Sequence, residues 1–360
     1  MYRLNLISRV SKCVLSGVEF IRSTTNARRN VHICRNIYAN PLQLVRIEKR
    51  RSYEGHKSQK KRYILFAASL PTLIFNFLFD VDEDTEKEVP EVIMTIKRSI
   101  LLIQKGELDK AEQMLHIALR QAQTMEHYDA VTYIYDVMAN LAFDREDYKK
   151  AEKLFVSVLQ RLMSNGATQD DMRIIHISLK MAKVYESQKE IKKADLGYKF
   201  CMDNLKSRIE RDPEDNDAVL LQAMTFDWYA EMLLSLSLYK EAFNYYLEAY
   251  NICKKIYGEE HEQTVVLLNA LATAKYKQGE LDEAIKYLSD AMKIGEKISD
   301  IAYLGTVYVN LGTMLLEKSL YKKARQLCQK GRKIAVKNED NDTLLEADEC
   351  LKEVNRLLYS

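Results

Sequence analysis

The histidines of this 360-residue chain are the side chains best suited to acid–base chemistry or metal binding. None of them stands beside a second ligand at a spacing typical of a metal site, such as H-E-x-x-H. Four fall in different segments of the repetitive region described below: His116, His127, His176 and His261. We interpret them as packing or surface residues, and we expect neither a metal nor a cofactor.

Cysteine and serine give no stronger indication of catalysis. The six cysteines contain no C-x-x-C pair, and Cys201 and Cys328 fall at packing positions of the repeat. This placement favours core thiols over metal ligands or a disulfide. The sequence has neither a glycine-rich phosphate loop nor a G-x-S-x-G motif. It therefore predicts a protein that is not an enzyme and has no small-molecule substrate.

The elements that position these side chains follow a repeat. An alanine recurs at Ala111, Ala151, Ala194, Ala242, Ala284 and Ala324. Three residues before each alanine stands a bulky apolar residue, and twelve residues before it stands a small one: Ser99, Ala139, Ala182, Ala230, Ala272 and Gly312. A larger side chain follows at four residues, and a mostly small one at seven. A block repeated at this period is typical of a solenoid.

Each block predicts two antiparallel helices whose small residues let the helix axes approach closely. We expect an all-α fold of about six helix pairs in residues 91–338, with Asp170, Asp215 and Asp300 as N-caps or first-turn acids. A capping helix is expected in residues 339–360. The apolar residues expected to cover the last pair are Leu344, Leu345, Leu351, Val354 and Leu358.

This pattern of small and large residues resembles the tetratricopeptide repeat. Its longer period resembles the extended repeats of kinesin light chain, as in Leu268-Asn-Ala-Leu-Ala and Tyr257-Gly-Glu-Glu-His. The resemblance implies a right-handed α-solenoid with a concave groove lined by the first helix of each pair. The repeat register places nine residues on that groove: Asp136, Asn140, Asp144, Lys183, Asp227, Glu231, Asn269, Thr273 and Lys277. Such a groove suits an extended peptide or helix that carries some positive charge.

Charge divides the chain into a basic leader and an acidic body. Residues 1–62 hold 15 Lys+Arg and 3 acidic residues, whereas the remainder holds 39 basic and 49 acidic residues. An arginine-rich, acid-poor leader is typical of a mitochondrial transit peptide, and Arg51-Ser52-Tyr53 resembles a matrix-peptidase cleavage site. A basic tail without fixed structure is the alternative. The acidic body argues against nucleic acid as a partner.

Residues 63–79 carry no charge and are a candidate transmembrane helix. Seventeen helical residues span about 26 Å, slightly less than a hydrocarbon core of about 30 Å. Lys60, Lys61 and Arg62 precede this stretch, and an acidic linker (80–90) follows it. This asymmetry predicts that the repeats face the intermembrane space, with a matrix-facing arrangement as the alternative. An apolar helix docked on the first repeat is also consistent with these residues.

Three stretches, Thr132–Phe143, Ile177–Ala182 and Gly197–Cys201, resemble a family of mitochondrial tetratricopeptide repeat proteins that attend respiratory complex III. The order of leader, apolar stretch, acidic linker and repeats is also similar. The resemblance implies a non-catalytic adaptor of the inner membrane. It further implies that the adaptor supports assembly and upkeep of complex III, including clearance of processing fragments of the Rieske iron–sulfur subunit.

Two other classes remain open from the sequence. One is an import receptor or co-chaperone of the outer mitochondrial membrane that binds peptide ligands through its repeats. Such receptors lack a long acid-poor leader, so residues 1–62 argue against this class. The other is a protease that removes the Rieske fragments, but no nucleophile–base pair supports it.

Overall fold

A computed structural model of the chain describes residues 91–298, 301 and 303–358, and within these residues every regular element is an α-helix. The described chain divides into two compact units, with the boundary between Thr225 and Phe226. The predicted all-α architecture of six helix pairs followed by a closing helix is confirmed in this part of the chain.

The predicted leader (1–62), candidate transmembrane helix (63–79) and acidic linker (80–90) lie outside the described residues. Asp300, predicted as an N-cap, lies outside them as well. Among the helices that are described, none combines the length and the apolar character needed to cross a bilayer.

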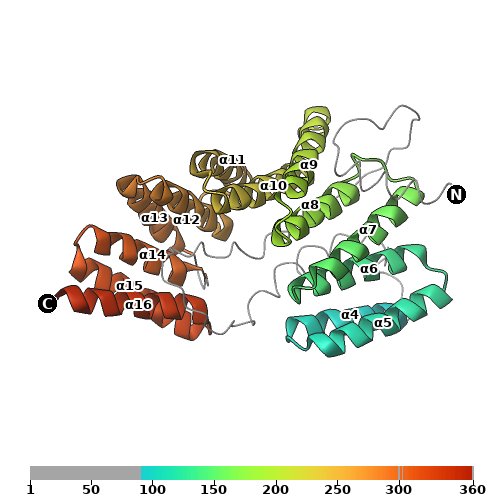
Figure 1. Ribbon diagram of the computed structural model, residues 1–360, viewed down its shortest axis with the longest axis horizontal. Coiled ribbons are helices and arrows are strands. Elements are labelled where there is room, and N and C mark those ends of the chain that lie inside the picture. Colours follow the sequence, from blue (N-terminus) through green and yellow to red (C-terminus); the bar gives the residue numbers. More distant parts are fainter. Residues whose placement is uncertain (1–90, 299–300, 302, 359–360) are drawn as a thin grey trace. The chain divides into compact units, whose positions relative to one another are not determined.

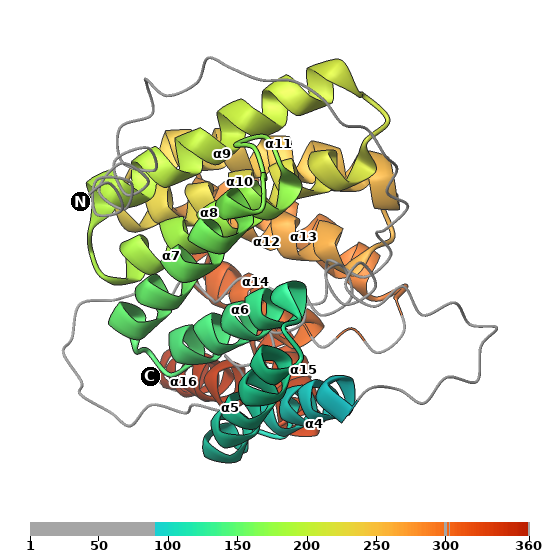
Figure 2. The ribbon, with the colours of Figure 1, turned by 90° about the vertical axis from the view of Figure 1, so that its right-hand side faces the viewer.

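Unit 1 contains three helix pairs and the start of a fourth (Figure 1). Its helices are α4 (Glu91–Gln104), α5 (Leu108–Thr124), α6 (Tyr128–Asp144), α7 (Tyr148–Ser164), α8 (Met172–Ser187) and α9 (Ile191–Arg211), followed by the first half of α10 (Asn216–Ser235). The two helices of a pair run side by side, as α4 and α5 do in both views (Figure 2).

Unit 2 contains the second half of α10 and the remaining pairs. Its other helices are α11 (Tyr239–Tyr257), α12 (Glu262–Lys277), α13 (Leu281–Gly295), α14 (Leu304–Glu317), α15 (Tyr321–Lys337) and α16 (Asn341–Leu358). Consecutive helices contact one another from α11 to α16, so each pair packs on its neighbours along the chain.

The repeated alanines form the centre of each helix pair. All six are fully buried, and so are the small residues twelve positions earlier and the fillers four positions later. The bulky residue three positions before each alanine is the first residue of the second helix of the pair. Within the last pair, a Cβ added at Gly331 of α15 would lie 2.7 Å from the carbonyl oxygen of Gly305 on α14. Small residues are therefore required where the helix axes approach most closely.

The turn inside each pair has a common geometry that its sequence only partly shows. The residue five positions before each alanine has a positive φ: Gly106, Glu146, Lys189, Ser237, Gly279 and Ser319. Its N–H and the next N–H bond back to the end of the preceding helix, as in Lys189 to Glu186 at 3.0 Å and Glu190 to Tyr185 at 2.8 Å. This is the bonding of a helix ending in a left-handed residue, where glycine is preferred. Only two of the six turns have glycine.

Two predicted N-caps can be compared with the structure. Asp215 accepts a hydrogen bond from the backbone N–H of Ala218 at 3.0 Å, which confirms it as a cap of α10. Asp170 is wrong as the cap of α8, since its neighbour Asp171 is the N-cap and accepts from the N–H of Arg173. Asp170 instead bonds Thr168 and Arg211.

The closing helix α16 packs partly through the predicted residues. Val354 is buried, and Leu351 and Leu358 pack against the same cluster. Leu345, also predicted to pack, is 61% exposed, whereas Thr343, Ala347 and Cys350 are buried. Cys350 forms a disulfide with Cys328 of α15. The prediction of a core thiol is therefore wrong for Cys328, because the repeat register gave no sign that the closing helix would place a second cysteine against it. Cys201 is a buried free thiol as predicted.

Candidate partner-binding surface

The nine residues predicted to line the groove lie on the first helices of four pairs. Six of them are less than a tenth exposed: Asp136, Asn140, Asp144, Asp227, Asn269 and Thr273. The other three, Lys183, Glu231 and Lys277, are half-buried. The face of the first helices that carries these nine residues, called the inner face below, is therefore more tightly packed than an open groove would be, and its buried polar groups need hydrogen-bond partners.

In unit 1 a buried lysine that the sequence analysis missed organises this face. Lys180 of α8 places its Nζ 3.1 Å from Oδ1 of Asp136 on α6, and both side chains are 1% exposed. The Lys180 ammonium also lies 5.7 Å from the centre of the Phe155 ring. Burial raises the pKa of Asp136 and lowers the pKa of Lys180, while their mutual attraction opposes both shifts. Whichever partner holds the proton, the pair carries no net charge.

Asn140 and Asp144 extend the polar row along α6, one turn apart. Asn140 hydrogen-bonds Asp136, and its own Oδ1 has no partner within the described chain. Oδ2 of Asp144 is likewise buried without a partner, and burial raises the pKa of this carboxyl to about 8. These unsatisfied acceptors would be matched by a donor, preferably a cationic one.

His176 lies on α8 one turn before Lys180 and is 8% exposed. Burial lowers its pKa well below 6.5, so the ring is neutral at physiological pH. The sequence-based interpretation of the histidines as structural fits this position. It also fits His127 and His261, whose Nδ1 atoms accept N-cap hydrogen bonds for α6 and α12.

In unit 2 the predicted groove residues on α12 bond to one another and to α14. Asn269 donates through Nδ2 to the Tyr303 hydroxyl at 2.9 Å and accepts at Oδ1 from Asn310 at 2.8 Å. Thr273 donates to the backbone carbonyl of Asn269 at 2.9 Å. The side-chain amide of Asn269 therefore links α12 to α14, the first helices of two consecutive pairs. Tyr303 and Asn310 were missed by the sequence analysis because they stand 34 and 41 residues from Asn269.

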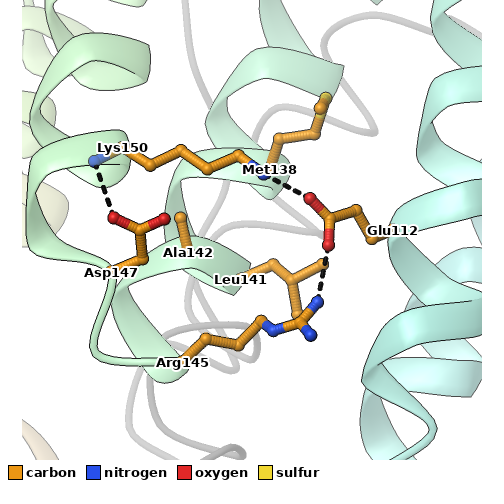
Figure 3. A pocket seen from close by; sticks show the side chains of 7 residues that line it. All are labelled: Glu112, Met138, Leu141, Ala142, Arg145, Asp147 and Lys150. Carbon is orange, nitrogen blue, oxygen red and sulfur yellow. Dashed lines mark hydrogen bonds and ion pairs between the residues drawn. The ribbon is translucent and has the colours of Figure 1, made fainter.

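A cavity of about 310 Å³ lies among α5, α6 and α7 (Figure 3). Glu112 points between two cations, with Oε2 2.5 Å from Nη1 of Arg145 and Oε1 bonded to Nζ of Lys150. Arg145 also pairs with Asp109. Since these acids neutralise the cations, the cavity is not arranged to bind an anion. Among the described residues no cluster of histidine, cysteine and carboxylate side chains could hold a metal ion.

The sequence is similar to proteins named tetratricopeptide repeat protein 19. The Drosophila melanogaster homologue is 35% identical over 294 residues, which is 82% of this chain and 80% of the fly protein. The human protein is 35% identical over 285 residues, or 76% of this chain and 75% of its own length. The chain belongs to the tetratricopeptide repeat protein 19 family. Both relatives carry the description "mitochondrial" in their names.

Membership of this family agrees with two further comparisons. The profile of the tetratricopeptide repeat matches residues 221–297. Among solved structures, BtubC from P. vanneervenii has a TM-score of 0.52 at 19% identity, covering 70% of this chain and 94% of that one. A Rap protein complexed with competence and sporulation factor has a TM-score of 0.53 at 16% identity, covering 84% and 85%. At this identity the solved structures show the fold alone. The repeats themselves imply protein–protein interaction and point to a scaffold rather than an enzyme.

Proposed function

We propose that this protein is a non-catalytic, membrane-anchored mitochondrial adaptor that binds respiratory complex III and supports its assembly and upkeep, including clearance of Rieske subunit fragments. The observation that carries the proposal is the family relationship, which covers about four-fifths of both this chain and the fly protein, a relative named mitochondrial. The basic leader and the uncharged stretch 63–79 add the features expected of an imported and anchored protein.

The polar inner face of the first helices is the proposed contact. In unit 1 its unsatisfied acceptors, Asn140 Oδ1 and Asp144 Oδ2, would select a partner segment with a basic side chain. In unit 2 the half-buried Glu231 and Lys277 would add polar contacts. An anchor raises the effective concentration of the repeats near membrane-bound partners into the millimolar range, so a weak contact suffices.

The proposed orientation places the repeats in the intermembrane space. The cations before residue 63 and the acids after residue 79 favour this direction of insertion. The disulfide between Cys328 and Cys350 also supports it, since disulfides persist in oxidising compartments and are rare where glutathione keeps thiols reduced.

Co-purification tests the partner. Tagged full-length chain is expressed in mitochondria and isolated in mild detergent, and complex III subunits are expected to co-purify with it. Loss of the chain is expected to leave Rieske fragments accumulated and complex III activity lowered. Absence of complex III subunits from the purified sample would contradict the proposal. If fractionation finds the chain in the outer membrane, an import receptor is indicated instead.

The burial of each side chain decides which variant can test the contact without unfolding the protein. Asp227 is only 6% exposed, so reversing its charge would disturb the fold as well as the surface. Burial keeps Asp144 largely protonated at neutral pH, and a basic partner would favour its carboxylate form. Asp144→Asn keeps the shape of the side chain and prevents that carboxylate from forming, so it is expected to weaken co-purification. The same substitution at Asp203, on the exposed side of α9, is expected to leave co-purification unaltered.

A further inference from the structure

The first helix of the described chain, α4, has an outer face of unusual composition. Its residues Val92, Ile93, Ile96 and Ile103 are buried against the rest of unit 1. On the opposite side one exposed stripe follows the helical spacing of four, three and four residues. It consists of Met94, Arg98, Leu101 and Lys105, bordered by Lys97, and is called the α4 stripe below.

The apolar members of the α4 stripe are well exposed. Met94 is 39% exposed and Leu101 is 49% exposed. At the other end of the repeats, α16 covers α15 through small and apolar residues such as Ala347 and Val354. The α4 stripe alternates apolar with basic residues, so covering it with another helix would bury two cations, Arg98 and Lys105. This composition fits a surface where apolar groups are buried and lysine and arginine reach a polar layer.

The charge of the first helix pair differs from that of the other repeats. Residues 91–125 hold five basic and four acidic residues, whereas residues 126–360 hold 33 basic and 39 acidic residues. The positive charge therefore lies at the end of the repeats that is nearest in sequence to residues 63–79. The eleven residues of the acidic linker reach at most about 40 Å when fully extended.

We propose that the α4 stripe lies against an anionic lipid surface, with Met94 and Leu101 in the headgroup–acyl boundary and Lys97, Arg98 and Lys105 paired with lipid phosphates. A helix with interleaved apolar and basic residues binds in this way, and anionic lipid contributes about fivefold in affinity for each basic residue near the surface. The inference goes beyond the proposed function, since it fixes how the first repeat is held at the membrane and does not depend on complex III.

A site-resolved experiment separates this contact from insertion of residues 63–79. The full chain carries a photoreactive phenylalanine analogue at position 101 and is mixed with nanodiscs of phosphatidylcholine, with or without 30% cardiolipin. Crosslinking to lipid is expected with cardiolipin and to be reduced at least fivefold without it. The same analogue at position 199, on the exposed side of α9 in the same unit, is the control and should not crosslink to lipid.

Two double variants test whether the basic residues beside position 101 are needed for lipid crosslinking. Lys97→Gln/Arg98→Gln is expected to reduce lipid crosslinking from position 101 at least tenfold in cardiolipin nanodiscs, while Lys192→Gln/Lys193→Gln on α9 leaves it unchanged. Circular dichroism verifies that each variant is folded. Crosslinking from position 101 to residues 63–79 of the chain itself, or equal lipid crosslinking with and without cardiolipin, would overturn the proposal.

The outcome also distinguishes this inference from the proposed anchor. A chain that resists carbonate extraction but does not crosslink from position 101 retains the anchor and refutes the α4 contact. A chain that crosslinks from position 101 but is released by carbonate refutes the anchor and keeps the α4 contact.

Discussion

Lys180 and Asp136 join the first helices of two consecutive pairs through an ion pair that is almost completely excluded from solvent, with Nζ 3.1 Å from Oδ1. The two residues are 44 positions apart and lie on α8 and α6. Because each would be an uncompensated buried charge without the other, the pair fixes the register of these helices in unit 1.

Removing one partner of this pair should be costly. Lys180→Met leaves the Asp136 carboxylate buried alone, and we expect a loss of about 3–5 kcal/mol in the free energy of unfolding, measured by urea denaturation. Lys180→Met combined with Asp136→Leu should recover most of that loss. Lys199→Met, on the exposed side of α9, is the control and should change stability by no more than about 0.5 kcal/mol. A single variant as stable as the parent would refute the role of the pair.

Asp144 should make unit 1 less stable as pH rises. Burial raises the pKa of this carboxyl to about 8 from an ordinary 3.8, so between these values the folded chain holds a proton that the unfolded chain has released. Stability therefore falls as pH increases through this window. Asp144→Asn removes the effect, so the variant should gain stability relative to the parent between pH 5 and 8. Urea denaturation across that range tests this, and a pH-independent difference contradicts it.

The turn at Lys189 stores backbone strain that glycine would relieve. Lys189 has φ of 66°, a left-handed conformation that L side chains rarely adopt. We expect Lys189→Gly to raise the free energy of unfolding by about 1 kcal/mol. The matched change Lys199→Gly, within helix α9, should lower it by about 0.5–1 kcal/mol. Thermal denaturation of both variants provides the comparison, and a decrease in both would mean that the turn is not strained.

The contact between Gly331 and Gly305 should not tolerate a methyl group. A Cβ at position 331 would also lie 2.5 Å from Cγ2 of Val309, so α14 and α15 must move apart. Gly331→Ala is expected to lower the free energy of unfolding by about 1–3 kcal/mol through overpacking, despite the better helix propensity of alanine. Lys330→Ala, the exposed neighbour, serves as the control. A more stable Gly331→Ala variant would contradict this packing.

The disulfide between Cys328 and Cys350 should contribute to the stability of unit 2. It closes a loop with a sequence separation of 22, for which chain entropy gives about 3 kcal/mol. Dithiothreitol should therefore lower the melting temperature of the parent chain but not of the Cys328→Ser/Cys350→Ser variant. Mass spectrometry of thiol-alkylated protein from mitochondria shows the natural redox state. Full alkylation of both cysteines without prior reduction would show that the disulfide is absent there.

The sequence by itself determined the helix pairs. The alanines and their small partners could be located because close approach of two adjacent helices requires small residues at fixed spacing. All of these residues lie close together in the sequence, within a single helix pair. The bulky residues three positions before the alanines belong to the same spacing, and the structure shows that two of them, Tyr148 and Tyr239, begin α7 and α11. The family resemblance also came from the sequence.

Only the tertiary structure decided which polar groups meet. Asp136 was predicted on the inner face, but Lys180 could not be assigned to it, because the distance between residues on two different helix pairs depends on how the pairs stack. Cys350 was missed for a similar reason, since the rotation of α16 about its own axis decides whether Leu345 or Cys350 faces α15. Local spacing fixes what one helix pair buries, whereas contacts between pairs depend on packing angles that no short stretch of sequence contains.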